Sequence, residues 1–150
     1  DVASATNRLT LIAAILPAGC VSTHTVFCLR TPLSARDQLF LCGLFNSLVV
    51  NYLVRLRVTT HVTTATVERL PIPTTEAAPA AAREIASLAR LLTRGPHAAA
   101  FATLNARVAE LYQLTADEFE HILATFPLIP EKERHQTLRL FRTDAYQTRS

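Results

Sequence analysis

The chain has 150 residues, of which 49% are hydrophobic and 18% are charged, and its formal net charge at pH 7 is +3. A chain of this length buries about 70% of the surface that it exposes when unfolded, which is enough for a hydrophobic core. The high apolar content and low net charge exclude disorder over the whole length. Three glycines and eight prolines without a regular repeat exclude a collagen-like or linker-like chain.

The cysteines and the missing methionine bear on the setting of the chain. Cys20, Cys28 and Cys42 are an odd number, all in the first third, which is not the pattern of a disulfide-bonded secreted domain. No basic-then-apolar leader opens the sequence. These features favour a reducing, cytoplasmic location. Because the sequence contains no methionine, we expect it to be a piece of a longer protein.

The net charge is confined to the first half of the chain. Residues 1–70 contain six arginines and three acidic residues, a net charge of +3, whereas nine cations balance nine carboxylates in residues 71–150. Fourteen of the fifteen cations are arginine. Arginine can form two parallel hydrogen bonds with a phosphate or with the edge of guanine. A GC-rich genome would also favour arginine codons, so the composition alone leaves both interpretations open.

Three segments carry the signals of β-strands. The apolar run 9–16 ends at Pro17-Ala18-Gly19, which predicts a buried strand closed by a turn. Residues 21–30 and 59–67 are rich in β-branched side chains, and a proline follows each segment. Together they predict a small mixed or antiparallel sheet.

The segment after Ser34 predicts one long, buried helix that runs through Leu56. Ser34 and Asp37 form a capping-box pattern at its start. The apolar stretch within it is shorter than a membrane span, and Asn46, Ser47 and Asn51 interrupt it. We therefore expect a core helix and no membrane partner.

From Thr74 onward, alanine and carboxylates dominate and the apolar spacing becomes helical. Gly95-Pro96 ends one helix, and Thr115 with Glu118 forms a capping box for another. The expected helices are 85–92, 101–111, 115–126 and a last one after Pro130. The predicted fold class is α+β, with a sheet and one long helix in residues 1–73, a linker at 74–79 and an all-helical part at 80–150.

The sequence lacks the motifs of nucleotide-binding and hydrolytic sites. Its glycines stand alone, so no GxGxxG or GxxxxGK[ST] loop is present, and neither GxSxG nor HExxH occurs. Four residues could supply zinc ligands, but their spacing is unlike that of structural zinc sites: Cys20, His24, Cys28 and Cys42. We expect ordinary buried thiols and no metal site. Three other histidines are expected at the surface or at helix caps: His97, His121 and His135.

Residues 51–64 combine two arginines with a run of hydrogen-bonding side chains. Arg55 and Arg57 lie at the end of the predicted long helix, and Thr59-Thr60-His61-Val62-Thr63-Thr64 follows. Arginine can contact phosphate or guanine, and threonine, histidine and asparagine can hydrogen-bond to phosphates or base edges. The same residues also suit a helix end and an exposed strand face. Composition alone therefore leaves nucleic-acid binding open.

Several segments follow one another in an order and spacing that points to a known family: 1–17, His24-Thr25, Asn46-Ser47, 52–57, Leu70-Pro71-Ile72-Pro73, 109–115 and 122–127. The first four resemble the target-recognition region of adenine-specific DNA methyltransferases of type II restriction-modification systems, especially chains that join a methylase and a nuclease. Leu70 to Pro73 is similar to the prolines that close recognition regions in these enzymes and in type I specificity subunits. The last two segments resemble the family's C-terminal helical segment.

The resemblance covers the recognition part of the family and not its catalytic part. The Pro-Pro-Tyr type motif that grips the flipped adenine and the glycine-rich cofactor motif are both missing. A nuclease core needs an acidic residue two positions before its lysine, where this chain has Pro130 before Lys132. Gln113 replaces the glycine that is usual after Leu-Tyr, which predicts a differently shaped turn.

The resemblance implies that the parent protein methylates adenine N6 with S-adenosylmethionine. DNA cleavage with magnesium is left open for the parent, and this piece is expected to need no cofactor and to lack catalysis by itself. We expect residues 1–73 to recognise double-stranded DNA and the helical part to brace them against the catalytic methyltransferase domain of the same parent chain. The alternative is a helical protein–protein interaction or structural module without DNA binding.

The expected DNA contacts are five cations and six polar residues. The cations are Arg8, Arg30, Arg55, Arg57 and Arg69. The polar candidates are Asn7, His24, Thr59, Thr60, His61 and Thr63.

Overall fold

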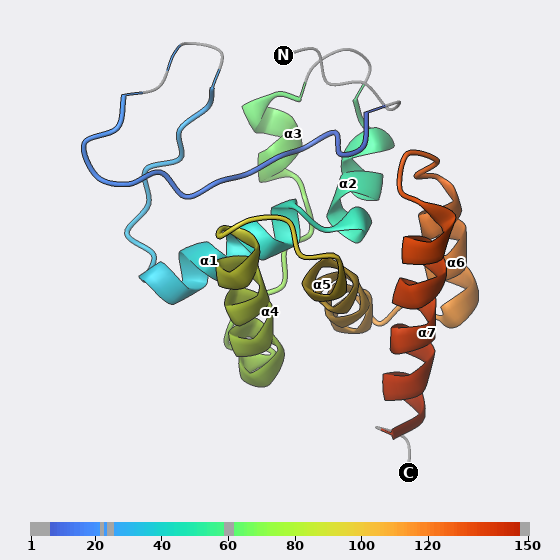
Figure 1. Ribbon diagram of the computed structural model, residues 1–150. Helices are drawn as coiled ribbons and strands as arrows, with labels where there is room; N and C mark the ends of the chain where they lie inside the picture. Colours follow the sequence, from blue (N-terminus) through green and yellow to red (C-terminus); the bar gives the residue numbers. More distant parts are fainter. Residues whose placement is uncertain (1–6, 22, 24–25, 59–61, 148–150) are drawn as a thin grey trace.

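The computed structural model describes residues 7–21, 23, 26–58 and 62–147. Within these residues the chain forms seven α-helices and no β-strand (Figure 1). They are α1 (Ala35–Phe45), α2 (Leu48–Arg55), α3 (Thr64–Glu68), α4 (Pro79–Leu92), α5 (Ala98–Leu111), α6 (Ala116–Ala124) and α7 (Glu131–Gln147). The predicted α+β fold class is therefore wrong, because the described part of the chain contains no sheet.

The described residues of the three predicted strands take other structures. Residues 9–16 have no regular secondary structure. Instead of a neighbouring strand, the side chains of Asn51 in α2 and of Asn46 just before it accept hydrogen bonds from their backbone amides. The described part of 21–30 contains neither helix nor strand. In 59–67, Thr63 caps α3, since its Oγ1 accepts from the Thr66 amide at 3.2 Å. Threonine suits both strands and N-caps, and in this segment the local cap determines the structure.

The predicted helix from Ser34 to Leu56 is two helices. Ser34 caps α1 as expected, with its Oγ accepting from the Asp37 amide at 3.2 Å. Helix α2 starts after Ser47, whose Oγ accepts from the Val50 amide at 3.3 Å. Among the described residues no single helix is long and apolar enough to cross a membrane, whereas α1 and α2 together pass that test as a pair bent by 60°.

The start of α2 is also held by a residue far along the chain. The Leu48 amide donates to Asn105 Oδ1 of α5 at 2.7 Å, across 57 positions. Asn105 Nδ2 in turn donates to the Phe101 carbonyl at 2.8 Å, which fixes the orientation of the carboxamide. A fully buried side chain of α5 thus satisfies an amide that the first turn of α2 leaves without a helical partner.

One hydrophobic core joins helices from both sides of the predicted linker at 74–79. Helix α4 packs against α1 and α5, and α7 packs against α5 and α6. The spacing predicted the buried faces of the later helices correctly, and the core includes Ile85, Leu104, Val108, Phe119, Ile122 and Phe126. Where one functional part ends and the next begins stays a prediction.

The caps of the later helices follow the sequence closely. Thr115 Oγ1 accepts from the Glu118 amide at 3.3 Å, and the Glu118 carboxylate accepts from the Thr115 amide at 2.8 Å. The Thr115 hydroxyl also donates to this carboxylate at 2.8 Å, and the hydrogen bonds from the Thr115 amide and hydroxyl lower the pKa of the Glu118 carboxyl. His97 caps α5 through Nδ1, which accepts from the Ala100 amide at 3.1 Å, while His121 and His135 are exposed. All three histidines are where they were predicted.

Helix α5 ends in a left-handed residue that is not glycine. Gln113 has φ +55°, and its amide donates to the Glu110 carbonyl at 2.9 Å while the Leu114 amide donates to the Ala109 carbonyl at 3.1 Å. This pair of bonds is a Schellman motif, in which glycine is the usual left-handed residue. The replacement of glycine by Gln113 predicted a differently shaped turn at this point. That prediction is wrong for the backbone, because Gln113 takes the left-handed conformation that glycine favours.

Gly43 lies where α1 touches α4 and gives the first prediction. A Cβ at Gly43 would lie 2.8 Å from Ile85 Cγ2 and 3.3 Å from Ala89 Cβ. Gly43→Ala should lower the free energy of unfolding by about 1 to 2 kcal/mol, because overpacking at this distance costs up to about 3 kcal/mol and alanine recovers only roughly 1 kcal/mol over glycine inside a helix. Urea denaturation measures the change. The control Ser87→Ala, at an exposed position of α4, should stay within about 0.5 kcal/mol. A Gly43→Ala variant as stable as the parent sequence would contradict this close packing.

Tyr112 ties the end of α5 to the proline segment 70–73. Its hydroxyl donates to the Pro71 carbonyl at 2.8 Å, and burial raises the pKa of Tyr112 from its usual 10 to about 12. Because the folded pKa is the higher one, this contribution to stability is complete below pH 10 and is lost as pH rises toward 12.

Tyr112→Phe should therefore remove part of the loss of stability between pH 10 and 12. At neutral pH the variant should lose about 1 kcal/mol, the usual size of one intramolecular hydrogen bond. Urea unfolding at a series of pH values measures both effects. Identical pH dependence in the parent sequence and the variant would show that Tyr112 does not titrate in this way.

Candidate functional site

The chain before α1 has two differently placed parts, which we name the strap and the arm. The strap, residues 7–14, runs across the helices, and the arm, which is the described part of residues 15–33 (15–21, 23 and 26–33), lies away from them except where it enters α1 (Figure 1). A turn lies within the arm as predicted, where the Cys20 amide donates to the Pro17 carbonyl at 3.3 Å and Gly19 has φ +85°. Seven of the eleven exposed large apolar side chains in the described part of the chain belong to the arm.

The guanidinium of Arg55 is held inside the molecule, at a point where three segments meet. Its Nε donates to Thr10 Oγ1 at 3.0 Å, and its Nη1 donates to the Thr125 carbonyl at 2.8 Å. Its Nη2 donates to the carbonyl of Asn7. The guanidinium carbon lies 3.8 Å from the centre of the Phe126 ring, and burial lowers the pKa of Arg55. Arg55 therefore joins the strap, α2 and the end of α6.

Two asparagines that sequence reasoning did not select complete the attachment of the strap. Asn51 Oδ1 accepts from the amides of Thr10 and Leu11, both at 2.8 Å. Asn46 Oδ1 accepts from the Ala13 amide at 3.1 Å, and Asn46 Nδ2 donates to the Ala13 carbonyl at 2.8 Å. Their position inside an apolar run was the available signal, because a buried carboxamide needs polar partners.

Arg8 is paired across the molecule. Its Nη2 lies 3.5 Å from Glu133 Oε2 of α7, and its guanidinium carbon lies 5.8 Å from the centre of the Phe101 ring. Its side chain is still 58% exposed, so this pair is of the weak surface kind. Arg36 likewise lies 3.4 Å from the carboxylate of Asp37.

The remaining predicted cations are exposed. Arg30 lies in the arm, Arg57 follows α2, and Arg69 caps the C-terminal end of α3. None of these three is in an ion pair within the described part of the chain, and Arg57 Nη1 donates to the Leu53 carbonyl at 3.2 Å. Thr63 is exposed and caps the other end of α3. Four candidates lie outside the described residues: His24, Thr59, Thr60 and His61.

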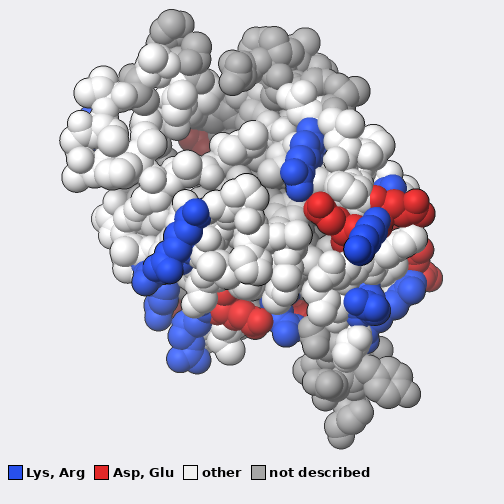
Figure 2. All heavy atoms as spheres, viewed as in Figure 1, with Lys and Arg blue, Asp and Glu red and all other residues white. Residues whose placement is uncertain are grey.

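The structure brings some of the predicted contact residues together and leaves others apart. Asn7 and Arg55 are in direct contact, whereas Arg8 points to α7 and Arg30 lies in the arm. On the face drawn in Figure 2, several lysines and arginines lie close together at the lower left, and others lie beside acidic side chains on the right, with a wide uncharged area between the two groups. The described basic side chains of that face therefore form two separate groups.

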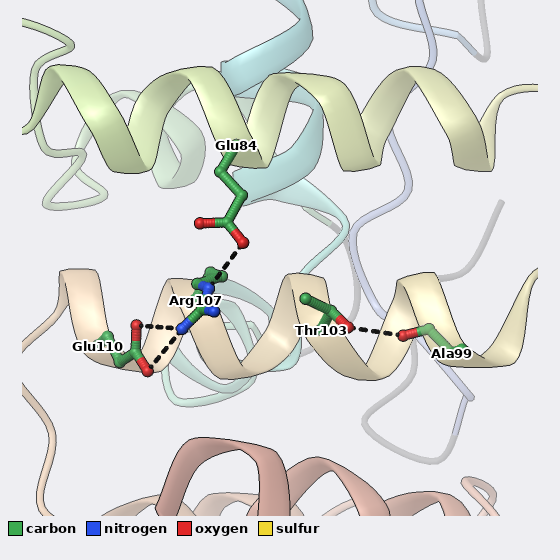
Figure 3. A network of polar contacts seen from close by, with 5 residues as sticks. All are labelled: Glu84, Ala99, Thr103, Arg107 and Glu110. Carbon is green, nitrogen blue, oxygen red and sulfur yellow. Dashed lines mark hydrogen bonds and ion pairs between the residues drawn. The ribbon is translucent and has the colours of Figure 1, made fainter. Parts of the chain in front are cut away.

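A further arginine is held between α4 and α5 (Figure 3). Arg107 Nε donates to Glu84 Oε1 at 2.8 Å, and its Nη1 donates to both Glu110 oxygens at 3.1 and 3.0 Å. Burial lowers the pKa of Arg107, but the hydrogen bonds and charges of Glu84 and Glu110 raise it more, so the net shift is upward. Arg107 therefore stays charged and serves the packing of α5 on α4.

The cysteines differ in their surroundings. Cys42 is buried beneath the strap, where its Sγ donates to the Ala13 carbonyl at 3.5 Å and burial raises the pKa of the thiol. Cys20 and Cys28 are exposed, so the prediction of buried thiols is wrong for these two, which lie in the arm and not in a core strand. No group of three or more His, Cys, Asp or Glu side chains that could hold a metal occurs in the described residues, and His24 lies outside them.

Replacing Arg55 tests its structural role. Arg55→Ala should lower the free energy of unfolding by about 2 to 4 kcal/mol, because partners in two segments lose a charged donor and Phe126 loses a stacked cation. Arg55→Lys should recover less than half of this loss, since a single ammonium cannot reach all three oxygens. The exposed neighbour Arg57→Ala is the matched control and should change the same quantity by less than about 0.5 kcal/mol. Equal losses for Arg55→Ala and Arg57→Ala in urea denaturation would contradict the role given to Arg55.

No protein-family model matches the chain, and neither does any curated protein or solved structure. The function of this chain therefore has to be inferred from its residues and their contacts, together with the family resemblance of its sequence segments.

Proposed function

We propose that this chain is part of the target-recognition region of an adenine-specific DNA methyltransferase, and that it contacts double-stranded DNA through Arg57, Arg69 and Arg30. The proposal rests on the order and spacing of the sequence segments that resemble this family. It keeps the cytoplasmic setting and a parent that uses S-adenosylmethionine, with this piece selecting the DNA sequence.

One structural observation supports the choice of cations. Residues 1–70 carry the whole net charge of +3, and three of their six arginines are engaged within the molecule or beside a carboxylate. The three that remain, Arg30, Arg57 and Arg69, are exposed and have no ion-pair partner among the described residues. Exposed arginines without a carboxylate partner can bind phosphate without first breaking an ion pair. Arg55 and Arg8, with their internal partners, act in this proposal by holding the strap in place.

The helical residues 80–150 act in this proposal as the brace toward the catalytic domain of the parent chain. Their net charge is only +1, from nine cations and eight carboxylates, and Arg107 illustrates how their charges are used inside the helical packing. One hydrophobic core connects these helices to α1 and α2, after which Arg57 lies.

The salt dependence of DNA binding tests the proposal. The chain should bind random-sequence duplex DNA at low salt, and the plot of log K against log salt concentration should become shallower by about one unit per phosphate contact removed. Arg57→Ala with Arg69→Ala should therefore reduce the slope by about 1 to 2. The matched control is Arg90→Ala with Arg139→Ala, two exposed arginines of α4 and α7, and should leave the slope unchanged. Fluorescence anisotropy measures all three proteins.

Two outcomes would overturn the proposal. If the control variant loses as much of the slope as Arg57→Ala with Arg69→Ala, the contact is a general effect of positive charge and not a defined surface. If the chain binds no duplex even at low salt, it does not recognise DNA by itself in the way proposed.

A second candidate, a protein–protein interaction module, is favoured by a different observation. The arm exposes Val21 to 97%, Phe27 to 71% and Leu29 to 70%, an unusual amount of apolar surface outside a core. Failure to bind DNA, together with loss of self-association or partner binding in Phe27→Ser with Leu29→Ser, would favour this candidate over the first.

A further inference from the structure

The strap is held by its backbone. Of the hydrogen bonds that Asn46 and Asn51 make to the described strap residues, all go to main-chain amides or carbonyls. Arg55 adds the carbonyl of Asn7, and contacts one side chain, the hydroxyl of Thr10. Asn46 pairs with both the amide and the carbonyl of Ala13, which is the way in which a carboxamide imitates a neighbouring strand.

The three helix residues form one polar row. Asn51 and Arg55 are four positions apart in α2, so they lie on the same face of that helix, and Asn46 caps the end of α1 just before it. Asn51 is held in place by its own Nδ2, which donates to the carbonyls of Phe45 and Ser47 at 2.9 Å each. The row is therefore ordered by the helices themselves.

The side chains of the strap fit the helices less completely than its backbone does. A cavity of about 270 Å³ lies between the strap and helices α1, α4 and α5, bordered by Leu9, Ala13 and Ala14 on the strap side. Leu9 and Leu11 are half-buried against the core, Arg8 pairs with Glu133 of α7, and Ile12 points to solvent. Only Thr10 is buried, beside Arg55. The strap therefore meets the helices mainly through main-chain hydrogen bonds and through few buried side chains.

We propose that Asn46, Asn51 and Arg55 form a binding site for an extended peptide, read through its main chain, and that residues 7–13 are its covalently attached occupant. The ligand class is an extended segment with a small hydroxyl residue at the position of Thr10 and apolar residues on both sides of it. Such a site accepts a separate peptide of this kind when the attached strap is released. This inference does not depend on DNA binding.

The experiment separates the strap from the body after folding. A protease recognition sequence is inserted at Gly19, in the exposed turn of the arm, and the folded full chain is cleaved there. A fluorescent peptide with the sequence of residues 7–16 is then added, and its exchange with the cleaved strap is followed by anisotropy. Circular dichroism of the cleaved protein verifies that the helices remain.

Three competitor peptides distinguish main-chain from side-chain recognition. The first has the native sequence, and the second carries Ile12→Thr with Leu16→Thr, at two exposed positions. The third replaces the amides of Leu11 and Ala13 by esters, which removes the donors to Asn51 and Asn46 without changing any side chain. The second should compete within about threefold of the first, and the third should be at least about tenfold weaker, since two lost hydrogen bonds of about 1 kcal/mol each exceed the 1.4 kcal/mol that corresponds to tenfold.

A variant of the body gives the complementary test. Asn46→Ala should weaken binding of the native peptide by about fivefold or more while the helices still form, because Asn46 makes the paired contact to Ala13. Cys28→Ser, at an exposed position of the arm, is the control and should bind the native peptide unchanged. Equal competition by the ester peptide, loss of competition by the side-chain variant, or absence of peptide exchange would each overturn the proposal.

Discussion

The guanidinium of Arg55 is the contact on which the arrangement of the first half depends. From the end of α2, this one planar group donates hydrogen bonds to the strap and to Thr125 at the end of α6. It also stacks on the ring of Phe126. Arginine suits this position because its donors point in several fixed directions and it keeps its charge under all ordinary conditions. The position of the strap follows from that one side chain together with Asn46 and Asn51.

The helices after residue 78 could be predicted from the sequence because their signals are local. Ile85 to Leu92 and Phe101 to Leu111 repeat apolar residues at helical spacing, and Thr115 with Glu118 forms the capping box seen in the structure. In the first half of the chain, the same kind of local signal gave wrong predictions. A β-branched or apolar run predicts a strand only if another strand is available to pair with it, and in the described residues helix side chains bind that backbone instead. Ser47 caps α2 at the point where the predicted long helix is interrupted. Because Ser47 stands inside an apolar run, it was not predicted to be a cap.

For the candidate contact residues too, local signals in the sequence were informative and long-range contacts could not be predicted. Composition identified the arginines, yet it could not separate Arg55 from Arg57, two residues apart in sequence and opposite in environment. The difference lies in partners such as Asn7 and Thr125, which are 48 and 70 positions away from Arg55. Long-range pairing of this kind leaves no mark in local spacing. Asn46 and Asn51 were recognisable in the sequence as carboxamides within an apolar segment. Only the structure shows that their hydrogen-bond partners are main-chain groups of the strap.

The contact between Asn105 and the first turn of α2 has a consequence for how the chain acquires its structure. The Leu48 amide finds its partner 57 positions later, in a helix that also supplies core residues such as Leu104 and Val108. During synthesis from the N-terminus, α1 and α2 emerge long before that partner exists, and closing a loop of this length costs entropy that local contacts do not repay. The first half of the chain therefore completes its fold only after α5 has left the ribosome.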